Sequence, residues 1–196
     1  MRLRLLVLVY FFSTNLIAQT GSWNIISVKL KINEKWSVFT EAQLRSLSFY
    51  DELFYYELKG GASYKLSKNI SVTGGLGIYE TYSPGGNFKN PKVNDEFRTW
   101  LQLDMTQDIK RLMIEHRYRV EQQWTSNGFH HRFRYRLNAT LPIAKGNIEP
   151  KTFYLNSSEE VFFTNNSPYF IKNRFFAGCG YVFTQLFTCQ TGYMQQ

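Results

Sequence analysis

Residues 115–123 read EHRYRVEQQ, and residues 132–138 read RFRYRLN. In both stretches a charged or amide side chain alternates with a side chain that is mostly aromatic or aliphatic, so the polarity repeats every second residue. Successive side chains of a β-strand point to opposite faces of a sheet, whereas an α-helix repeats after about 3.6 residues. The two stretches therefore predict strands with one polar and one apolar face.

The same alternation continues through most of the chain and predicts further strands. Their expected ranges, with the two above, are about 23–32, 36–45, 53–66, 70–80, 95–105, 111–123, 129–141, 153–163, 170–183 and 186–195. Most of them exceed the usual soluble strand of about 5–6 residues. They match the roughly 9–11 tilted residues that cross the hydrocarbon layer of a membrane.

Alternation by itself fits two architectures. The apolar faces turn inward in a soluble exported β-sandwich, and they turn to lipid in a membrane barrel. Strand length, a signal peptide and aromatic residues near strand ends favour the barrel, so we predict an all-β, antiparallel up-and-down transmembrane β-barrel of about 10–12 strands. The aromatic residues assigned to its interfacial girdles are Trp23, Trp36, Tyr64, Tyr79, Tyr82, Trp124 and Phe129.

The N-terminus has the layout of a secretory signal peptide. Two arginines precede the apolar run Leu5–Phe12, which is too short to span a membrane as a helix. We expect cleavage after Ala18, with a signal peptide over residues 1–18 and an outer-membrane β-barrel domain over residues 19–196. A buried N-terminal strand is the alternative, but polar and turn-prone residues follow directly.

Composition and charge restrict the partners. Aromatic residues make up 17% of the chain and charged residues 19%, which excludes a disordered chain. Two cysteines are too few for a disulfide scaffold or a Cys-based zinc site. The net charge of +8 suggests nucleic acid, but the alternation turns arginines and aromatic residues to opposite faces, so we expect no nucleic-acid partner. We expect outer-membrane lipid as the partner, with exposed lysines such as Lys89 and Lys92 near anionic head groups.

Charged side chains lie in the middle of the strands, where they form ladders on one face. Two neighbouring basic ladders need acidic partners from other strands, because a buried lone charge is costly. We expect Arg–carboxylate pairs to fill and close the lumen. An anion-selective ring, or a site for a phosphate or carboxylate ligand, is the alternative. The predicted ladder residues are Glu41, Glu57, Glu96, Arg98, Glu115, Arg117, Arg119, Glu121, Arg132, Arg134, Arg136, Glu160 and Arg174.

These features predict an outer-membrane barrel that is structural or passively conducting. Besides membrane lipid, small anions are its expected partners. The alternatives are an anion-selective pore and a lipid-modifying enzyme with His130 and His131 near Ser126 at a strand end. Neither a Gly-x-Ser-x-Gly nor a His-Glu-x-x-His motif occurs, and we predict no catalytic residues, metal or cofactor. By parity His116 faces lipid beside Tyr118.

The two cysteines lie on the last two predicted strands. A three-residue turn at 183–185 would set Cys179 opposite Cys189 and allow a disulfide in an oxidising compartment. A two-residue turn at 184–185 would put the two thiols on opposite faces. Both registers stay open, and two unpaired cysteines are favoured.

Several short motifs, taken in order, resemble one family. They are Trp23 with its strand, Leu44-Arg45, Tyr64–Leu66, Glu115–Gln122, Arg134–Arg136, and Asn173-Arg174 with Gly178–Tyr181. Together they resemble the DUF2490 family of Gram-negative bacteria over nearly all of the mature chain. The resemblance implies an outer-membrane β-barrel without an established activity, and it carries over no catalytic residues. We also expect a further strand beyond residue 196, because outer-membrane barrels usually end on an aromatic residue.

Loop lengths give a conflicting indication of topology. The predicted turns at 33–35, 67–69 and about 106–110 are short, and the predicted loops at 46–52, 83–94 and 124–128 are longer. Barrels keep short turns on the periplasmic side, so this pattern starts the first strand on the outer side. An even-stranded barrel with both ends in the periplasm would start it inside. The pattern therefore favours an odd number of strands, about eleven, or an exception to the loop rule.

Overall fold

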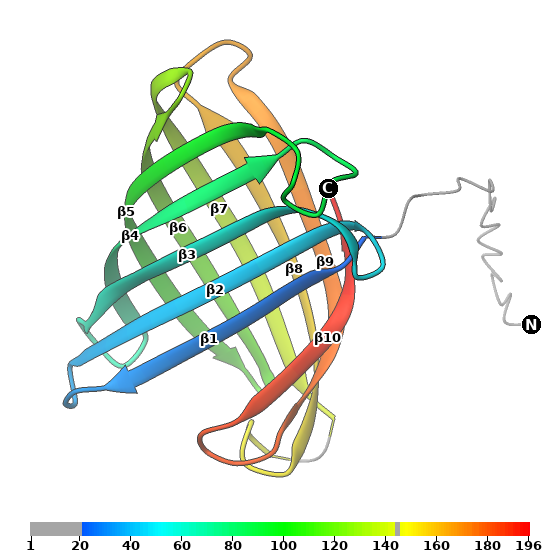
Figure 1. The fold of residues 1–196 in the computed structure, drawn as a ribbon. Helices are drawn as coiled ribbons and strands as arrows, with labels where there is room; N and C mark the ends of the chain where they lie inside the picture. The colour runs from blue at the N-terminus through cyan, green and yellow to red at the C-terminus, as the bar shows by residue number, and fades with distance from the viewer. Residues whose placement is uncertain (1–20, 144–145) are drawn as a thin grey trace, which may run out of the picture.

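The computed structural model describes residues 21–143 and 146–196, and the predicted signal peptide lies outside them. All regular structure in the described part of the chain is β-strand, as Figure 1 shows. None of these residues forms a helix with the length and hydropathy that a bilayer span requires.

Each predicted strand is present, and several are longer than predicted, because ladder pairing continues beyond the predicted limits, for example to Ile109 opposite Leu112. The strands are β1 (Trp23–Lys31), β2 (Trp36–Ser48), β3 (Asp51–Lys65), β4 (Ile70–Tyr82), β5 (Lys92–Ile109), β6 (Leu112–Thr125), β7 (Gly128–Pro142), β8 (Thr152–Thr164), β9 (Phe170–Val182) and β10 (Thr188–Gln195).

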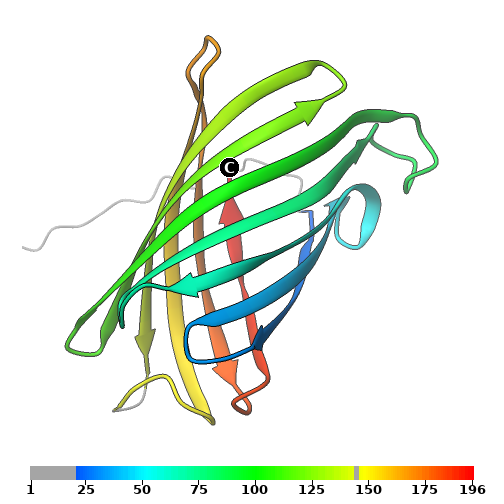
Figure 2. The same ribbon diagram turned by 90° about the vertical axis from the view of Figure 1, so that its left-hand side faces the viewer.

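The sheet has the simplest possible connectivity. Each strand pairs with its neighbours in the chain, in the order β1 to β10, and all the pairs are antiparallel. Figures 1 and 2 show that the sheet curls, so that its two walls face each other across an interior. Among the described residues β1 and β10 do not pair with one another. The predicted fold class is confirmed: the protein is all-β, with a 10-stranded up-and-down sheet that forms a curled half-barrel, as in a β-barrel.

The two faces of the sheet differ in polarity, and exposure follows the opposite trend to that of a water-soluble protein. On β6, Val120 is 45% exposed and Trp124 is 43% exposed, whereas Glu121 between them is fully buried. On β5, Leu101 is 61% exposed. Most charged and amide side chains point into the curl, and most aliphatic side chains point away from it. Soluble proteins show the opposite, because they rarely bury charged residues. We call the two faces the interior face and the outward face.

Connections of similar length occur at both ends of the sheet. Residues 49–50 join β2 to β3 and residues 126–127 join β6 to β7, so both connections are shorter than predicted. The longer connection at 143–151 lies at the end where short turns were expected. The predicted asymmetry is therefore wrong, and with it the indication of an odd strand number. β1 begins at the same end of the sheet at which β10 ends.

Candidate functional site on the interior face

Two buried glutamates form the centre of the interior face. Glu121 on β6 accepts hydrogen bonds from Arg132 Nε at 2.7 Å and from Arg134 Nη1 at 2.6 Å. The Nη1 atom of Arg119 lies 3.5 Å from the same carboxylate. Glu121 therefore faces three arginines from two strands while it is shielded from solvent.

Glu160 on β8 has the same arrangement. It accepts hydrogen bonds from Arg117 Nη2 at 2.8 Å and from Arg134 Nη2 at 2.8 Å, and Arg174 Nη1 lies 3.4 Å from its second oxygen. Arg134 thus bridges Glu121 and Glu160. The planar guanidinium, with donors on several edges, suits this bridge better than a compact ammonium does.

Strand register explains why carboxylates are needed at this point. β6 and β7 pair with Arg119 directly opposite Arg134, and like charges in that position destabilise a sheet. The carboxylates on either side of Arg134 offset the repulsion. A one-residue slip of a strand would turn its charges to the outward face, so the pairs also specify register.

Smaller ion pairs surround the two central glutamates. They are Lys59 with Glu41 and Glu57 (2.5 Å each), Arg98 with Glu96 (2.7 Å) and Arg136 with Glu115 (2.6 Å). The structure places each residue predicted for the charge ladder on the interior face, within an ion pair.

The predicted charge ladder leaves out three basic members of this face: Arg45, Lys59 and Lys172. Alternation already puts Arg45 on the same strand face as Glu41, and Lys59 on the same strand face as Glu57, so both belong to the ladder by parity. Lys172 stands two residues before a predicted ladder arginine on β9, which carries the same signal.

Aromatic rings cover several of the arginines. The Arg98 guanidinium carbon lies 3.7 Å from the ring centre of Tyr79, and that of Arg45 lies 3.7 Å from the ring centre of Trp23. The prediction that places Trp23 and Tyr79 in outward girdles is therefore wrong. Both residues have interior parity, and a ring face that contacts a cation gains an electrostatic attraction which an outward position would lose.

A glycine provides space for one of the interior aromatic residues. A Cβ atom at Gly75 would lie 2.2 Å from the ring of Trp100, whereas a Cβ at the neighbouring Gly74 would meet nothing within 4 Å. Gly75 therefore lets a large ring lie directly against the backbone of β4.

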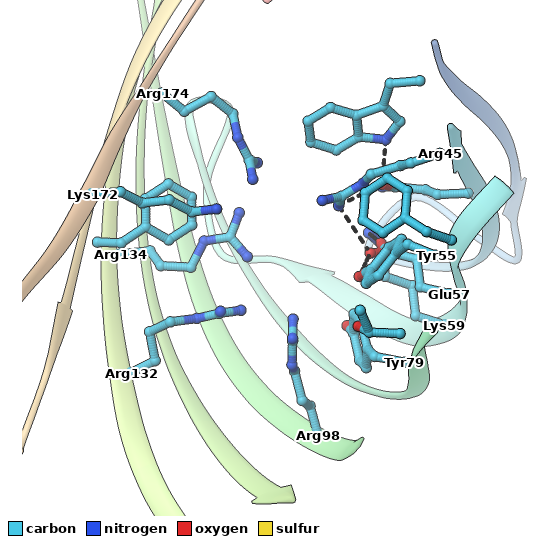
Figure 3. A pocket seen from close by; sticks show the side chains of 15 residues that line it. Arg45, Tyr55, Glu57, Lys59, Tyr79, Arg98, Arg132, Arg134, Lys172 and Arg174 are labelled. Atoms are coloured by element: carbon cyan, nitrogen blue, oxygen red, sulfur yellow. Dashed lines mark hydrogen bonds and ion pairs between the residues drawn. The ribbon is translucent and has the colours of Figure 1, made fainter. Parts of the chain in front are cut away.

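Cavities lie on both sides of the central glutamates. One, of about 270 Å³, lies toward the end of the sheet where β1 begins, and Figure 3 shows the basic side chains that line it. Another, of about 330 Å³, lies toward the other end and is lined by Glu115, Arg136 and Asn156 among others. Among residues 21–143 and 146–196, none lines both cavities.

A family model matches this chain. It is described as "Protein of unknown function (DUF2490)", and the match covers residues 20–196. The chain belongs to the DUF2490 family. Because the match runs from before β1 to beyond β10, membership applies to the whole sheet, and the resemblance seen in the short motifs is confirmed. Comparison with curated proteins and with solved structures finds no match.

In this DUF2490 chain His116 on β6 lies apart from His130 and His131, which are adjacent on β7. His116 lies on the outward face, where its Nδ1 is 2.9 Å from the hydroxyl of Tyr135. Within residues 21–143 and 146–196 no hydrogen bond joins Ser126 to His130 or His131, as a nucleophile and its base would require. The same residues contain no group of His, Cys, Asp or Glu side chains that could hold a metal ion.

The cysteines of the DUF2490 chain are free and exposed. β9 and β10 pair with Cys189 opposite Tyr181 and Cys179 opposite Thr191. The connection spans residues 183–187, which is longer than either turn considered from the sequence, so neither of those registers occurs. Both thiols lie on one face, two residues apart along the ladder, and do not form the disulfide that one register would have allowed.

Proposed function

We propose that this DUF2490 protein is an outer-membrane β-barrel whose outward face contacts lipid and whose interior is closed by Arg–carboxylate pairs. Its role would be structural or, at most, passively conducting. The observation that carries the proposal is the inverted polarity of the sheet, in which the charged Glu121 is fully buried and the apolar Val120 beside it is exposed. A lipid-facing barrel has this distribution of side chains.

A soluble sandwich fits the exposed apolar residues poorly. It would need a second layer packed on the outward face. Among the described residues no element covers that face, and Ile26 on β1 is 73% exposed. In water such a continuous apolar surface promotes association or aggregation, whereas hydrocarbon solvates it.

Outward aromatic residues gather near both ends of the strands. At one end the rings of Trp36 and Tyr64 are 4.8 Å apart. At the other end the ring of Trp124 lies 5.7 Å from that of Phe97 and 5.2 Å from that of Phe129. Bands of this kind at the two limits of an apolar zone match the aromatic girdles of membrane barrels.

The outward face also carries a polar pair, Glu159 and Asn173, whose side chains form a 3.0 Å hydrogen bond. An acidic residue on the lipid face of a barrel costs less than a basic one, and a hydrogen-bond partner lowers that cost further. The pair is therefore compatible with lipid contact.

The interior network supports a closed rather than an open barrel. Arginines from β6, β7 and β9 converge on Glu160 of β8, so side chains from four strands meet in the interior. An ion that entered would have to replace charges already paired at short distance. This arrangement favours a plugged lumen over a wide pore.

Fractionation of the full-length protein tests the membrane location. We expect the protein from a Gram-negative host to stay in the outer-membrane pellet through high-salt washing and to be released by detergent. We also expect the unboiled, folded form to migrate differently from the boiled form in gel electrophoresis. Release by salt alone would contradict the proposal and favour a soluble exported protein.

Planar-bilayer recording tests the closed interior separately. We expect the refolded protein to insert without large, stable conductance steps, because paired charges occupy the centre of the interior. Large anion-selective steps would contradict closure and would favour an anion-selective pore.

A further inference from the structure

We propose that the cavity near the start of β1 binds a compact organic anion through its phosphate or carboxylate groups. Its volume of about 270 Å³ is close to the lower limit of ligand pockets, roughly 300 Å³, and suits a small solute or a single head group. In Figure 3, Arg45 reaches into it from one wall, and Lys172 and Arg174 reach into it from the other. The inference deepens the proposed function and rests on its charged interior face.

The lining of the cavity has a large excess of positive charge. It includes seven basic side chains and one acidic side chain, Glu57. Two buried glutamates next to the cavity already form ion pairs with these basic side chains. Glu121 pairs with both Arg132 and Arg134, and Glu160 pairs with Arg134 as well. Outside the lining, Glu41 pairs with Lys59 and Glu96 pairs with Arg98. These five glutamates are still fewer than the seven basic side chains, so part of the positive charge at the cavity is uncompensated.

Three of the basic residues have the weakest compensation. The shortest distances from Arg45 and from Arg174 to a carboxylate oxygen are both 3.4 Å, whereas a strong charge-assisted hydrogen bond measures about 2.7–2.9 Å. The Nε atoms of both arginines are buried and have no hydrogen-bond partner. Lys172 forms no ion pair within the described part of the chain, and its ammonium donates instead to the side-chain oxygen of Gln196 at 2.6 Å. Sheltered cations of this kind are costly unless an anion accompanies them.

Aromatic rings hold two of these cations in fixed positions. The guanidinium carbon of Arg45 lies 3.7 Å from the ring centre of Trp23 and 4.1 Å from that of Tyr55, so it contacts two rings. The guanidinium carbon of Arg174 lies 4.6 Å from the Trp23 ring and 4.9 Å from the Phe162 ring. Cations held in this way lose little side-chain freedom when a ligand arrives. Their planar forks match the two oxygens of a carboxylate or phosphate.

Titration calorimetry of the detergent-solubilised full-length protein tests this site, with inorganic phosphate and citrate as probes. We expect saturable binding of at least one probe by the wild type. The Lys172→Gln and Arg174→Gln variants should each bind at least about tenfold more weakly, because a hydrogen bond to a charged group contributes that much. Lys29→Gln is the matched control. This variant removes one positive charge from β1, as Lys172→Gln does from β9. Lys29 is about 20 Å along the strand from Trp23, so the variant should bind the probes with the affinity of the wild type.

Lys172→Gln keeps the test independent of folding, because it breaks no ion pair of the described chain. Its folded state is checked by the heat-dependent shift in gel mobility. Failure of the wild type to bind either probe, or wild-type affinity in either Lys172→Gln or Arg174→Gln, would overturn the proposal.

A second arm identifies the source of the anionic group. Phosphatidic acid in mixed micelles that displaces the bound probe would assign the site to a lipid head group, and absence of displacement would assign it to a soluble anion. Both results keep the proposed site. If the protein binds citrate but is released from the membrane by salt, the anion site is supported and the proposed membrane location is contradicted. If the protein stays in the membrane but binds neither probe, only the proposed anion site is contradicted.

Discussion

Replacing Glu121 by Gln removes a shared carboxylate and leaves the shape of the side chain nearly unchanged. Arg132 and Arg134 would keep their positive charges in a place where Glu121 is 0% exposed. At an effective dielectric constant of about 20, one pair of charges at about 4 Å contributes about 4 kcal/mol, and repulsion among the arginines adds to the loss. Removal of one partner from a buried ion pair costs about 3–5 kcal/mol. We expect Glu121→Gln to lower the free energy of unfolding by that amount.

Urea unfolding of the protein in phospholipid vesicles measures this loss. The four tryptophans provide the fluorescence signal, and linear extrapolation gives the free energy in the absence of urea. Glu34→Gln is the control, because the Glu34 side chain is 91% exposed and lies 2.7 Å from Lys31 in a turn. The hydrogen bond from Lys31 holds the pKa of Glu34 below its usual value, but water screens an exposed pair, so we expect no measurable change in unfolding free energy.

A double-variant cycle shows whether the loss arises from the ion pair itself. Arg134→Gln combined with Glu121→Gln should cost less than the sum of the two single changes, because the second change removes a charge that the first has left uncompensated. A loss below about 1 kcal/mol for Glu121→Gln, the size of an ordinary substitution, would refute the reasoning from buried charge.

Three further predictions use the same protein. Leu101→Arg should lower the unfolding free energy in vesicles by about 2–4 kcal/mol, because it places a guanidinium on the outward face, which the proposed function puts in contact with lipid. Gly75→Ala should lower it by about 1–3 kcal/mol, because the added Cβ would overlap the Trp100 ring, whereas Gly74→Ala should change it little. Under denaturing but non-reducing conditions, both cysteines should react with an alkylating reagent, and mass spectrometry counts the added groups.

Each of these three has a contradicting result. If Leu101→Arg leaves the unfolding free energy unchanged, position 101 faces water and not lipid. If Gly75→Ala and Gly74→Ala have equal effects on stability, the close contact between Gly75 of β4 and the Trp100 ring is contradicted. A mass without alkyl groups would require a disulfide, and therefore a different register between β9 and β10.

The strand pattern was predictable from sequence because each strand alternates with little interruption. In β6, Arg119, Glu121 and Gln123 share one parity, and Tyr118, Val120 and Trp124 share the other, so one reading frame assigns every side chain to a face. Prediction fails where residue composition is given more weight than parity. Trp23 was assigned to a girdle because it is aromatic and near a strand end, although its parity is that of Arg45 in the neighbouring strand.

The ion-pair partners were not predictable, because they depend on register and on curvature together. Arg134 reaches carboxylates on both neighbouring strands, and the register of β7 against β8 is set across the long connection at 143–151. Contact between Arg174 on β9 and Trp23 on β1 requires the sheet to curl, which no local pattern specifies. The cavity near β1 arises from the same curvature.

Accessibility of single cysteines along β8 tests the central orientation most directly. In a variant with serine at both native cysteines, cysteine is introduced at Leu155 or Val161, which have outward parity, and at Asn156 or Ser158, which have interior parity. Each is labelled with a fluorophore and reconstituted in vesicles that contain brominated lipid. We predict strong quenching of the labels at Leu155 and Val161 and weak quenching at Asn156 and Ser158. Equal quenching at all four positions, or the reverse order, would contradict an outward face in contact with lipid.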